Sequence, residues 1–554
     1  MILGISFGYH DSAAAIIDKD IIAFSLEERF SRIKHDKSFP TNAIEFCLEE
    51  ANINIKDIEK VVYYEDTLLK FDRILGDIQK LSYKNEIISS YINKLDIKEY
   101  IANEINISKD KIEYLTHHLS HASSAFISPF ENCGILVIDG VGEKDTLSIW
   151  KKEYNNLTKL YQISFPHSIG LLYSVFTAFL GFEVNEGEYK VMGLAPYGEA
   201  KYKDMIYLLI KQIDNFLLDE SYFDFYSKLY PFNDKFLKMF GNPKKNSDYD
   251  LLKDKYYADI AASIQAVVEE LIFFYIQKTI NLTKEKNIVF CGGVALNSVA
   301  NAKIKDNFNI NFFVPPDPSD GGSALYSAIY YQKVKNKKDY SYRLKSPFLG
   351  KKYNKNDIKK AMEEQFFGDY EYIPNKNEFL KKVAYLLSKN NVIGWFWDRF
   401  EFGPRALGHR SILASPISEN MKDIINKKIK FRESFRPFAP SILDKYAKEY
   451  FEIDKLGINE IESYMLGVNK TLSNKIPAVT HKGTSRVQVV FKENNQMYYD
   501  LIKEFYNITN IPVLLNTSFN LKGEPIVNSP KEAILTFSYS YMDYLAMFPY
   551  ILKR

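Results

Sequence analysis

The chain has 554 residues, which is too long for one hydrophobic core, so two or more domains are expected. Its 72 basic and 70 acidic residues nearly cancel, and this balance argues against a dedicated nucleic-acid binder. No apolar run reaches membrane-spanning length. The first residues, Met1–Phe7, lack a basic segment and are typical of a first strand rather than a signal peptide, so we predict a cytoplasmic protein.

The N-terminal region is predicted to begin with a three-strand hairpin unit. The apolar runs Met1–Phe7, Ala13–Ile17 and Ile21–Leu26 flank a polar turn at Gly8–Ser12. A similar unit recurs further along the chain, in the stretches 134–142, 146–150 and 160–164. Because glycine-containing turns expose N–H groups to anions, the repeat predicts a duplicated fold with two phosphate-facing hairpins.

Three of the eight histidines lie within five residues, at His117, His118 and His121. They follow a strand-like segment at Lys111–Leu115 and lead into a predicted helix. His117 and His121 are four residues apart, so a helix places both rings on one face, as in a two-imidazole metal site. A helix start with capping and core histidines explains the same pattern, and the spacing does not separate the two.

A third glycine element is predicted at Asn287–Asn297, where a strand, a Gly-Gly turn and a helix follow one another. The start of that helix suits a phosphate or a nucleotide sugar, and close packing of strand and helix is the alternative. The stretch Pro315–Gly322 then opens another helix with Asp320 at or near its cap. A linker at 333–353 precedes a second α/β region with a strand at Asn391–Phe396.

Motifs spread over most of the chain together resemble the NodU/CmcH-type O-carbamoyltransferases. The matching stretches are Gly8–Ala14, Glu27–His35, the histidine run, Glu188–Gly198, Phe402–Ser411, Phe435–Pro440 and Asn516–Asn520. The resemblance implies an α/β protein with two domains. Residues 1–345 would form a duplicated, actin-like ATPase domain of the Kae1/TsaD type, and 346–554 a YrdC-like α/β domain. The second would make carbamoyl adenylate from carbamoyl phosphate and ATP, and the first would pass the carbamoyl group to an acceptor hydroxyl.

The same resemblance implies site residues in the first domain. His117, His121, Asp139 and Asp320 match the family's metal ligands, with iron as its metal, although this donor set also fits zinc. His10 matches a general base, or else a turn histidine bonded to Asp11, and Lys34 matches an acceptor contact, or else a solvated charge. We assign contacts with a nucleotide or carbamoyl adenylate to Asp139, Gly140, Gly170, Lys190, Gly292, Gly293 and Asn297.

The second domain would have to bring two mutually repelling anions together, which requires fixed cations. Two short stretches with few acids supply Arg405, Arg410, Lys430, Arg432 and Arg436, and a solvated surface is the alternative for any one of them. Ser518 and Asn520, after a strand predicted at Ile511–Leu515, are expected to bond the carbamoyl or phosphate group. His481 and Arg486 belong to another polar cluster predicted to line the site.

The leading hypothesis is an ATP-dependent O-carbamoyltransferase acting on a small-molecule or sugar hydroxyl, in a family used in antibiotic, toxin and nodulation-factor biosynthesis. We expect Fe(II) or another divalent metal in the first domain, with ATP, Mg and carbamoyl phosphate as co-substrates. No nucleic-acid or membrane partner is expected, and homo-oligomer formation is left open. The alternatives are a tRNA threonylcarbamoylation-type enzyme and an actin-like sugar kinase or nucleotide-binding regulator. No motif names the acceptor.

Overall fold

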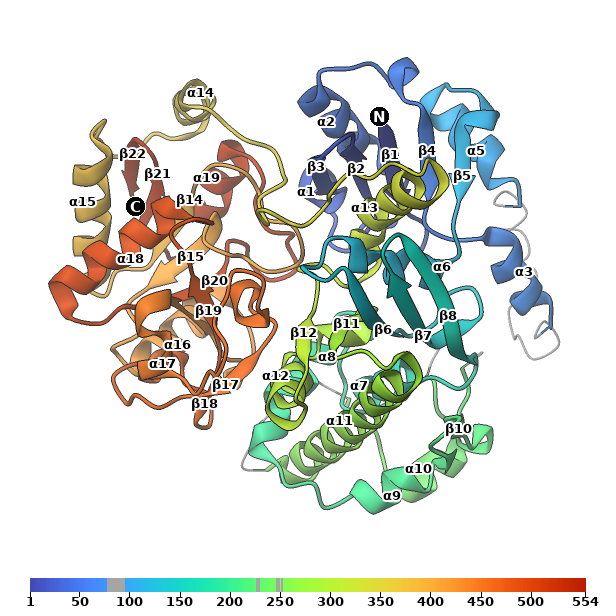
Figure 1. Ribbon diagram of the computed structural model, residues 1–554. Coiled ribbons are helices and arrows are strands. Elements are labelled where there is room, and N and C mark those ends of the chain that lie inside the picture. The colour runs from blue at the N-terminus through green and yellow to red at the C-terminus, as the bar shows by residue number, and fades with distance from the viewer. Residues whose placement is uncertain (77–94, 226–229, 246–249, 251–252) are drawn as a thin grey trace. The chain divides into compact units, whose positions relative to one another are not determined.

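The computed structural model describes residues 1–76, 95–225, 230–245, 250 and 253–554 (Figure 1). The chain forms two compact units, each assembled from three stretches. The first contains Met1–Ser6, Ala14–Ile21 and Ala51–Arg343, and the second contains Phe7–Ala13, Ile22–Glu50 and Leu344–Arg554. No helix within the described ranges combines the length and apolar character needed to cross a bilayer. The domain boundary at 345/346 stays a prediction.

Two five-stranded sheets share one strand order. In each, three consecutive strands lie side by side, and two later strands extend the sheet beyond the first of the three. Their orders are β3-β2-β1-β4-β5 and β8-β7-β6-β11-β12. The strands of the first are β1 Ile2–Ser6, β2 Ala13–Ile17, β3 Ile21–Leu26, β4 Lys60–Tyr63 and β5 Ile112–Tyr114. Those of the second are β6 Asn132–Ile138, β7 Asp145–Glu153, β8 Asn156–Ser164, β11 Asn287–Cys291 and β12 Asn311–Phe313. The predicted hairpin units and their repetition are confirmed.

Parallel pairing explains why functional groups gather in the first unit. Strand β4 is parallel to β1 and β5, and β11 is parallel to β6 and β12. The carboxyl ends of parallel strands meet at one edge of a sheet, which is where ligands bind in open α/β sheets. Asp139 and Gly292 directly follow β6 and β11. Helix α13 packs against β1, and Gly4 permits this because a Cβ there would lie 1.8 Å from the Ala324 carbonyl oxygen.

The remaining elements of the first unit cover these sheets. The helices are α3 Thr67–Gly76, α5 Ile97–Ile105, α6 His117–Ala122, α7 Ile169–Phe179, α8 Glu188–Leu194, α9 Lys203–Tyr207, α10 Asp234–Phe240, α11 Lys255–Thr283, α12 Ser298–Asn307 and α13 Asp320–Tyr330. A small separate sheet pairs β9 Ile210–Gln212 with β10 Leu217–Leu218. The long helix α11 contacts β6 and β7 as well as α7, α8 and α9 (Figure 1).

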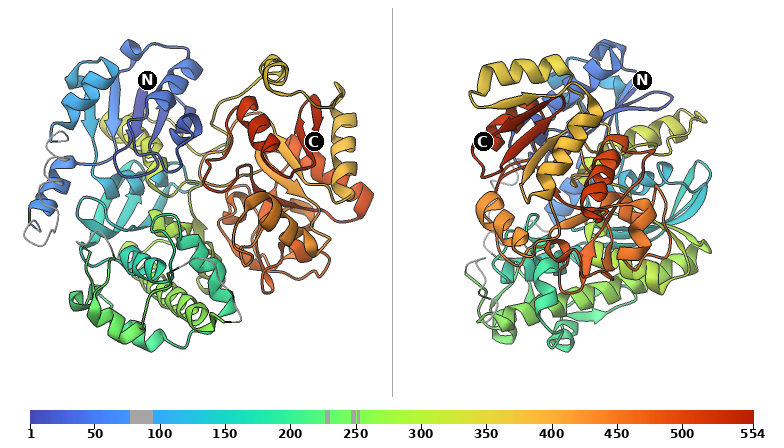
Figure 2. Two further views of the ribbon diagram at one scale, coloured as in Figure 1. Left: turned by 180° about the vertical axis from the view of Figure 1, so that it is seen from behind. Right: turned by 90° about the vertical axis from the view of Figure 1, so that its left-hand side faces the viewer.

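The second unit is built on an eight-stranded mixed sheet of order β13-β22-β21-β14-β15-β20-β16-β19. Its C-terminal stretch, from Leu344 on, is coloured yellow to red in Figure 2. Its strands are β13 Tyr370–Tyr372, β14 Ile393–Phe396, β15 Arg410–Ala414, β16 Ala439–Leu443, β19 Gln488–Val490, β20 Val513–Ser518, β21 Tyr544–Met547 and β22 Tyr550–Lys553. A short ribbon pairs β17 Val468–Lys470 with β18 Thr484–Arg486. The helices are α1 Glu28–Ser31, α2 Thr41–Ala51, α14 Lys355–Gln365, α15 Lys376–Ser388, α16 Asn420–Ile424, α17 Ala447–Tyr450, α18 Gln496–Thr509 and α19 Pro530–Ser538.

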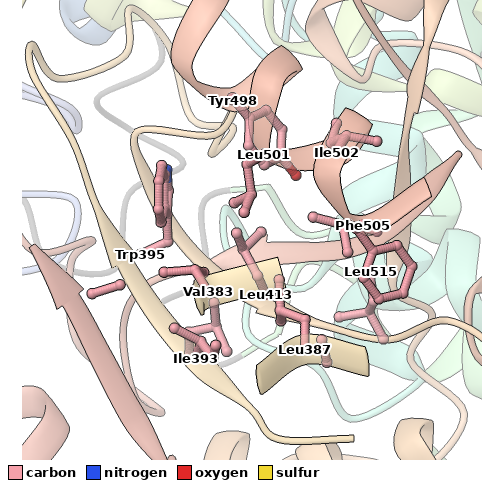
Figure 3. Packing of buried hydrophobic residues seen from close by; sticks show 14 of the residues in the cluster. Val383, Leu387, Ile393, Trp395, Leu413, Tyr498, Leu501, Ile502, Phe505 and Leu515 are labelled. Atoms are coloured by element: carbon pink, nitrogen blue, oxygen red, sulfur yellow. The ribbon is translucent and has the colours of Figure 1, made fainter. Parts of the chain in front are cut away.

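The core of the second unit follows from helical periodicity. Helix α15 buries Leu380, Val383 and Leu387, three and four residues apart, so that they form one apolar stripe. Figure 3 shows residues of α15 and α18 packed with Trp395 and Leu413 of the sheet strands. A strand was predicted at 511–515, and these bounds are wrong, because β20 begins at Val513. It runs to Ser518, so that this serine ends the strand instead of following it.

Candidate functional site

A cluster of two imidazoles and two carboxylates lies in the first unit. Helix α6 begins at His117, so His121 lies one turn on, and both rings are buried. His117 Nε2 is 2.9 Å from Asp139 Oδ2 and 3.0 Å from His121 Nε2. Asp320, the first residue of α13, places Oδ1 3.4 Å from each of these ring nitrogens. Four side chains from three segments far apart in the sequence thus converge on one point.

The spacing of these four side chains fits a single divalent metal ion. One ligand atom from each lies within 4.8 Å of all the others. Ligands about 2.0–2.2 Å from one ion in adjacent coordination positions are about 3 Å apart, which is the spacing observed. Two imidazoles and two carboxylates are borderline donors that suit Fe(II) and zinc alike. The geometry supports a metal and does not distinguish between these two.

The imidazoles and carboxylates of the cluster shift one another's pKa. Burial alone would lower the pKa of His121, but hydrogen bonds and charges from Asp139 and Asp320 raise it to about 9. Burial alone would raise the pKa of Asp139, and the two histidines instead hold it well below its usual range. Asp139 therefore remains ionised, and its charge is available to a cation at this point.

Neighbouring groups fix the ligands. Glu143 Oε1 accepts hydrogen bonds from the backbone N–H of His117 at 2.7 Å and of Asp66 at 2.6 Å. Burial raises the pKa of Glu143 to about 7. Ser323 Oγ lies 3.3 Å from Nδ1 of His121. His118 differs from its two neighbours, because its Nδ1 bonds Ser148 Oγ at 2.7 Å.

The glycine turns converge on Asp139. The N–H groups of Gly140 and Gly293 donate to Asp139 Oδ1 at 2.8 and 3.3 Å. Gly292 has φ +88°, and a Cβ there would lie 2.2 Å from the Ile138 carbonyl oxygen, so glycine is required at that position. Gly170 lies equally close, since its Cβ would be 2.6 Å from the Asp139 carbonyl oxygen. The predicted glycine turns at Gly140 and Gly292–Gly293 therefore lie beside Asp139 of the His/Asp cluster.

Two other residues assigned to nucleotide contacts lie in different settings. Asn297 caps α12 by accepting from the Ala300 N–H at 3.1 Å, and it also bonds Gln265. Lys190 lies in α8 with its ammonium 5.6 Å from the centroid of the Phe182 ring. Their assignments stay predictions.

A second polar cluster lies in the second unit around Asp11. Its Oδ2 is 2.9 Å from His10 Nδ1, and its Oδ1 is 2.8 Å from His35 Nδ1. Glu28 accepts from the His35 backbone N–H at 3.0 Å and pairs with Arg29 at 2.9 Å. The Lys34 charge opposes protonation of His35. His10 and Lys34, which the resemblance assigned to the first domain, thus lie in the second unit on two separate segments that the contact between Asp11 and His35 joins.

The second unit also gathers positive charge. Burial lowers the pKa of Arg486 well below its usual range, and the charges of Arg405, Arg432 and Arg436 lower it further. Arg486 follows a tight turn closed by hydrogen bonds between the backbones of His481 and Thr484. Its Nε is shielded from solvent and has no hydrogen-bond partner among the described residues. A group of guanidinium ions this close together is expected to bind anions.

Lys430 joins this group from the end of a π-helical turn, Ile425–Lys430. Burial, Arg432 and Arg436 hold its pKa well below its usual range. Its ammonium donates to the Asn520 carbonyl oxygen at 2.9 Å and to Oδ1 of the same residue at 2.7 Å, and it also bonds Ser518. Lys430 therefore binds both Ser518 and Asn520 in the structure, and the contact of these three residues with a ligand stays a prediction.

Arg410 is placed differently from the other arginines. It is fully buried, and its guanidinium donates to the carbonyl oxygens of Trp397, Asp398 and Asn528 at 2.6, 3.0 and 3.2 Å. Glu401 Oε1 accepts from the backbone N–H groups of Leu407, His409 and Arg410 at 2.9, 2.9 and 3.0 Å. This carboxylate thereby organises the loop that presents Arg405.

Two family models cover most of the chain. The model described as Carbamoyltransferase N-terminus matches residues 1–329, and the one described as Carbamoyltransferase C-terminus matches residues 384–554. The chain belongs to the carbamoyltransferase family. The resemblance to NodU/CmcH-type enzymes is confirmed, and the protein is a carbamoyltransferase.

Relatives of this carbamoyltransferase include an uncharacterized protein of Synechocystis sp. (strain ATCC 27184 / PCC 6803 / Kazusa), 39% identical over 100% of this chain and 96% of that protein. The nodulation protein NolNO of Sinorhizobium fredii is 33% identical over 98% of this chain and 79% of its own length. Nodulation protein U of Rhizobium tropici is 31% identical over 49% of this chain and 45% of its own.

Solved structures give weaker similarities to the carbamoyltransferase. The activator of the 2-hydroxyisocaproyl-CoA dehydratase from Clostridium difficile is 18% identical, with a TM-score of 0.32 over 61% of this chain and 96% of that chain. HypF of T. kodakarensis is 12% identical, with a TM-score of 0.31 over 60% of this chain and 48% of its own. A mixed α/β fold is confirmed, whereas a YrdC-like second domain is not.

Two carboxylates that organise the carbamoyltransferase site were not predicted. Glu143 lies one residue beyond the predicted turn that ends at Gly142, and Glu401 lies just before the Phe402–Ser411 motif. A carboxylate next to a glycine-rich turn is the available signal, since such turns leave backbone N–H groups without partners. The chain offers many acids, however, and only the fold shows which ones accept these hydrogen bonds.

Proposed function

We propose that the protein is an ATP-dependent O-carbamoyltransferase that acts through carbamoyl adenylate. Carbamoyl phosphate, ATP and water would give carbamoyl adenylate, pyrophosphate and inorganic phosphate. The carbamoyl group then passes to a hydroxyl of a small-molecule or sugar acceptor, with release of AMP. The observation that carries the proposal is the group of guanidinium ions around Arg486, whose own Nε has no hydrogen-bond partner among the described residues, because such a group suits anionic substrates.

The adenylation step is assigned to the second unit. Arg405, Arg432, Arg436 and Arg486 neutralise the phosphates of the two substrates, which otherwise repel each other. Lys430 holds Ser518 and Asn520 in place, and their side chains bond the carbamoyl or phosphate group. Arg410 serves this step by positioning the loop, because its donors already bond backbone carbonyl oxygens.

The first unit is assigned the metal ion and the adenylate in carbamoyl transfer. His117, His121, Asp139 and Asp320 would hold Fe(II), and the ion, when bound, supplies a Lewis acid that stabilises negative charge on a carbonyl oxygen. The turns at Gly140, Gly170, Gly292 and Gly293, together with Lys190 and Asn297, would hold the adenylate. Glu143 bonds the backbone N–H at the start of the helix that carries both histidines, and Ser323 contacts the His121 ring.

The acceptor hydroxyl needs a base, because an alcohol is a weak nucleophile at neutral pH. We assign this role to His10, whose Nδ1 bonds Asp11 and whose Nε2 is thereby left as the basic nitrogen. Lys34 contacts the acceptor. As the hydroxyl oxygen attacks the carbamoyl carbon, its proton moves to His10 Nε2, and AMP leaves with the electron pair of the broken bond.

The test is pyrophosphate release from ATP by the purified protein, with and without carbamoyl phosphate. Release that requires carbamoyl phosphate is expected, and it should fall at least 100-fold in Arg486→Met while persisting in the His117→Ala/His121→Ala variant. The matched control is Lys428→Met, a change of an exposed cation in the same unit. Pyrophosphate release without any dependence on carbamoyl phosphate would refute the proposal and favour a kinase or nucleotide-dependent regulator.

A further inference from the structure

One carboxylate in the second unit serves two imidazoles. The Asp11 oxygens lie 2.9 and 2.8 Å from Nδ1 of His10 and of His35 respectively. The Asp11 side chain is 17% exposed, and those of His10 and His35 are 24% and 36% exposed. The two rings are therefore shielded enough to interact through Asp11 and still able to exchange protons with water.

This arrangement fixes the tautomer of both rings. An ionised carboxylate only accepts hydrogen bonds, so each Nδ1 facing Asp11 has to donate. When the rings are neutral, each carries its lone pair on Nε2. The structure therefore holds two imidazoles in the tautomer that a general base requires, although only His10 has been assigned that role.

Two residues of this cluster adopt a backbone conformation that is unfavourable for non-glycine residues. Asp11 and His35 have φ values of 51° and 52°, in the left-handed region that non-glycine residues disfavour. The Ser12 N–H bonds the Asp36 carbonyl oxygen at 2.8 Å, and the His35 N–H bonds Glu28 at 3.0 Å. Strain that neighbouring hydrogen bonds maintain is typical of functional sites.

The charges around the two rings leave Asp11 as their shared anion. His35 is influenced by Asp11, Glu28 and Lys34, and Glu28 is itself paired with Arg29. Burial alone would lower the pKa of His35, and the hydrogen bond and charge of Asp11 raise it. Burial alone would raise the pKa of Asp11, and the two histidines instead hold it far below its usual range. Asp11 is thus the negative charge that both rings share, and Glu28 adds to the stabilisation of a protonated His35.

We propose that His35 is a positioning residue for His10. His35 competes for the negative charge of Asp11 and so makes His10 harder to protonate. A protonated His10 cannot accept the proton of the acceptor hydroxyl, so His35 widens the pH range in which the base is ready. The importance of this effect for catalysis rests on the proposed function. The coupling of the two rings rests on the geometry alone.

The test is a histidine-ring NMR titration of the full-length protein labelled at ¹³Cε1, without substrates. The His10 signal is assigned from its absence in His10→Gln. In His35→Asn the amide can still donate to Asp11, but the titrating charge is gone. We expect the midpoint of the His10 titration to rise by about 0.5–1 pH unit, as for two charges about 6 Å apart in a partly solvated site. An unchanged midpoint would overturn the proposal.

A reciprocal measurement keeps the proposal falsifiable if His35→Asn does not fold. Coupling is mutual, so the His35 midpoint should rise by the same amount in His10→Asn. No shift of the His35 midpoint in that variant would equally overturn the proposal. The acid limb of the pH profile for carbamoyl transfer is then compared between the wild-type protein and His35→Asn. A shifted NMR midpoint with an unshifted limb would overturn the positioning role and the assignment of His10 as base, while carbamoyl-phosphate-dependent pyrophosphate release would still stand.

Discussion

Replacing Arg486 with methionine is expected to stabilise the substrate-free protein while weakening its binding of anions. Burial and three neighbouring arginines lower the pKa of this guanidinium, so its charge is unfavourable in the folded state. Replacing buried ionic groups with apolar side chains of similar size often stabilises proteins by roughly 1–4 kcal/mol. Because Arg486 is only half-buried, we expect about 1–2 kcal/mol, or a rise in Tm of roughly 2–8 °C for a unit of this size.

The opposite effect is expected when phosphate-containing ligands are present. A ligand at 100 times its Kd stabilises the folded state by about 2.7 kcal/mol. Thermal unfolding of the wild-type protein should therefore shift upward with inorganic phosphate or ATP, and the shift should be at least halved in Arg486→Met. Lys428→Met, which removes an exposed cation, should change neither quantity by more than about 0.5 kcal/mol.

Two results would refute this reasoning. A substrate-free Arg486→Met protein that is less stable than wild type would mean that acids compensate the guanidinium in the native state. A phosphate-induced shift as large as in the wild-type protein would mean that the arginine cluster does not bind the anion. The measurement needs no knowledge of the acceptor, because the substrate-free protein and a simple anion are sufficient.

Three further outcomes are expected. Glu401→Ala should destabilise the protein by about 3–5 kcal/mol in urea unfolding, because three buried N–H groups lose their acceptor. Glu401→Gln should lower the free energy of unfolding less, since its amide oxygen can still accept. Equal losses in the two variants would contradict the role of Oε1. His117→Ala/His121→Ala should abolish the visible absorption that Co(II) gives when added to the metal-free protein, whereas His118→Ala should retain this absorption. Loss of the absorption in both variants would contradict the assignment of the metal ligands. His35→Asn should destabilise the protein most below pH 6.5. The difference in the free energy of unfolding between wild type and variant should shrink as the pH rises through the raised pKa of His35. A difference that grows with pH in urea titrations would contradict this reasoning.

Much of the first unit was predictable from local sequence patterns. The strands at 13–17, 21–26 and 287–291 coincide with the observed ones, because short apolar runs bounded by glycine or polar turns have few alternatives. The histidine spacing correctly predicted a helix that places His117 and His121 on one face. Helix α6 is only six residues long, however, and Asp139 and Asp320 reach it from other elements. No periodicity encodes that convergence.

The second unit was less predictable, for reasons that are physical. Arg405 and Arg410 belong to one motif, yet Arg410 turns inward to bond carbonyl oxygens. The sequence pattern of a guanidinium that binds backbone is the same as that of one that binds phosphate. The hydrogen bond between Lys430 and Ser518 was not predicted, since a contact between residues 88 positions apart depends on how the whole unit folds.

The contact of Arg32 with the C-terminal part of the chain has a consequence for how the protein is made. Its guanidinium donates to the carbonyl oxygens of Pro525 and Ile526, both at 2.8 Å, across 493 and 494 positions of sequence. At a synthesis rate of about 5–20 residues per second, the stretch that carries His10 and Lys34 leaves the ribosome roughly 25–100 s before its partners exist. During that interval its apolar residues have to be protected by other means. The speed of translation and the supply of chaperones are therefore expected to set the yield of active enzyme as strongly as the stability of the finished fold.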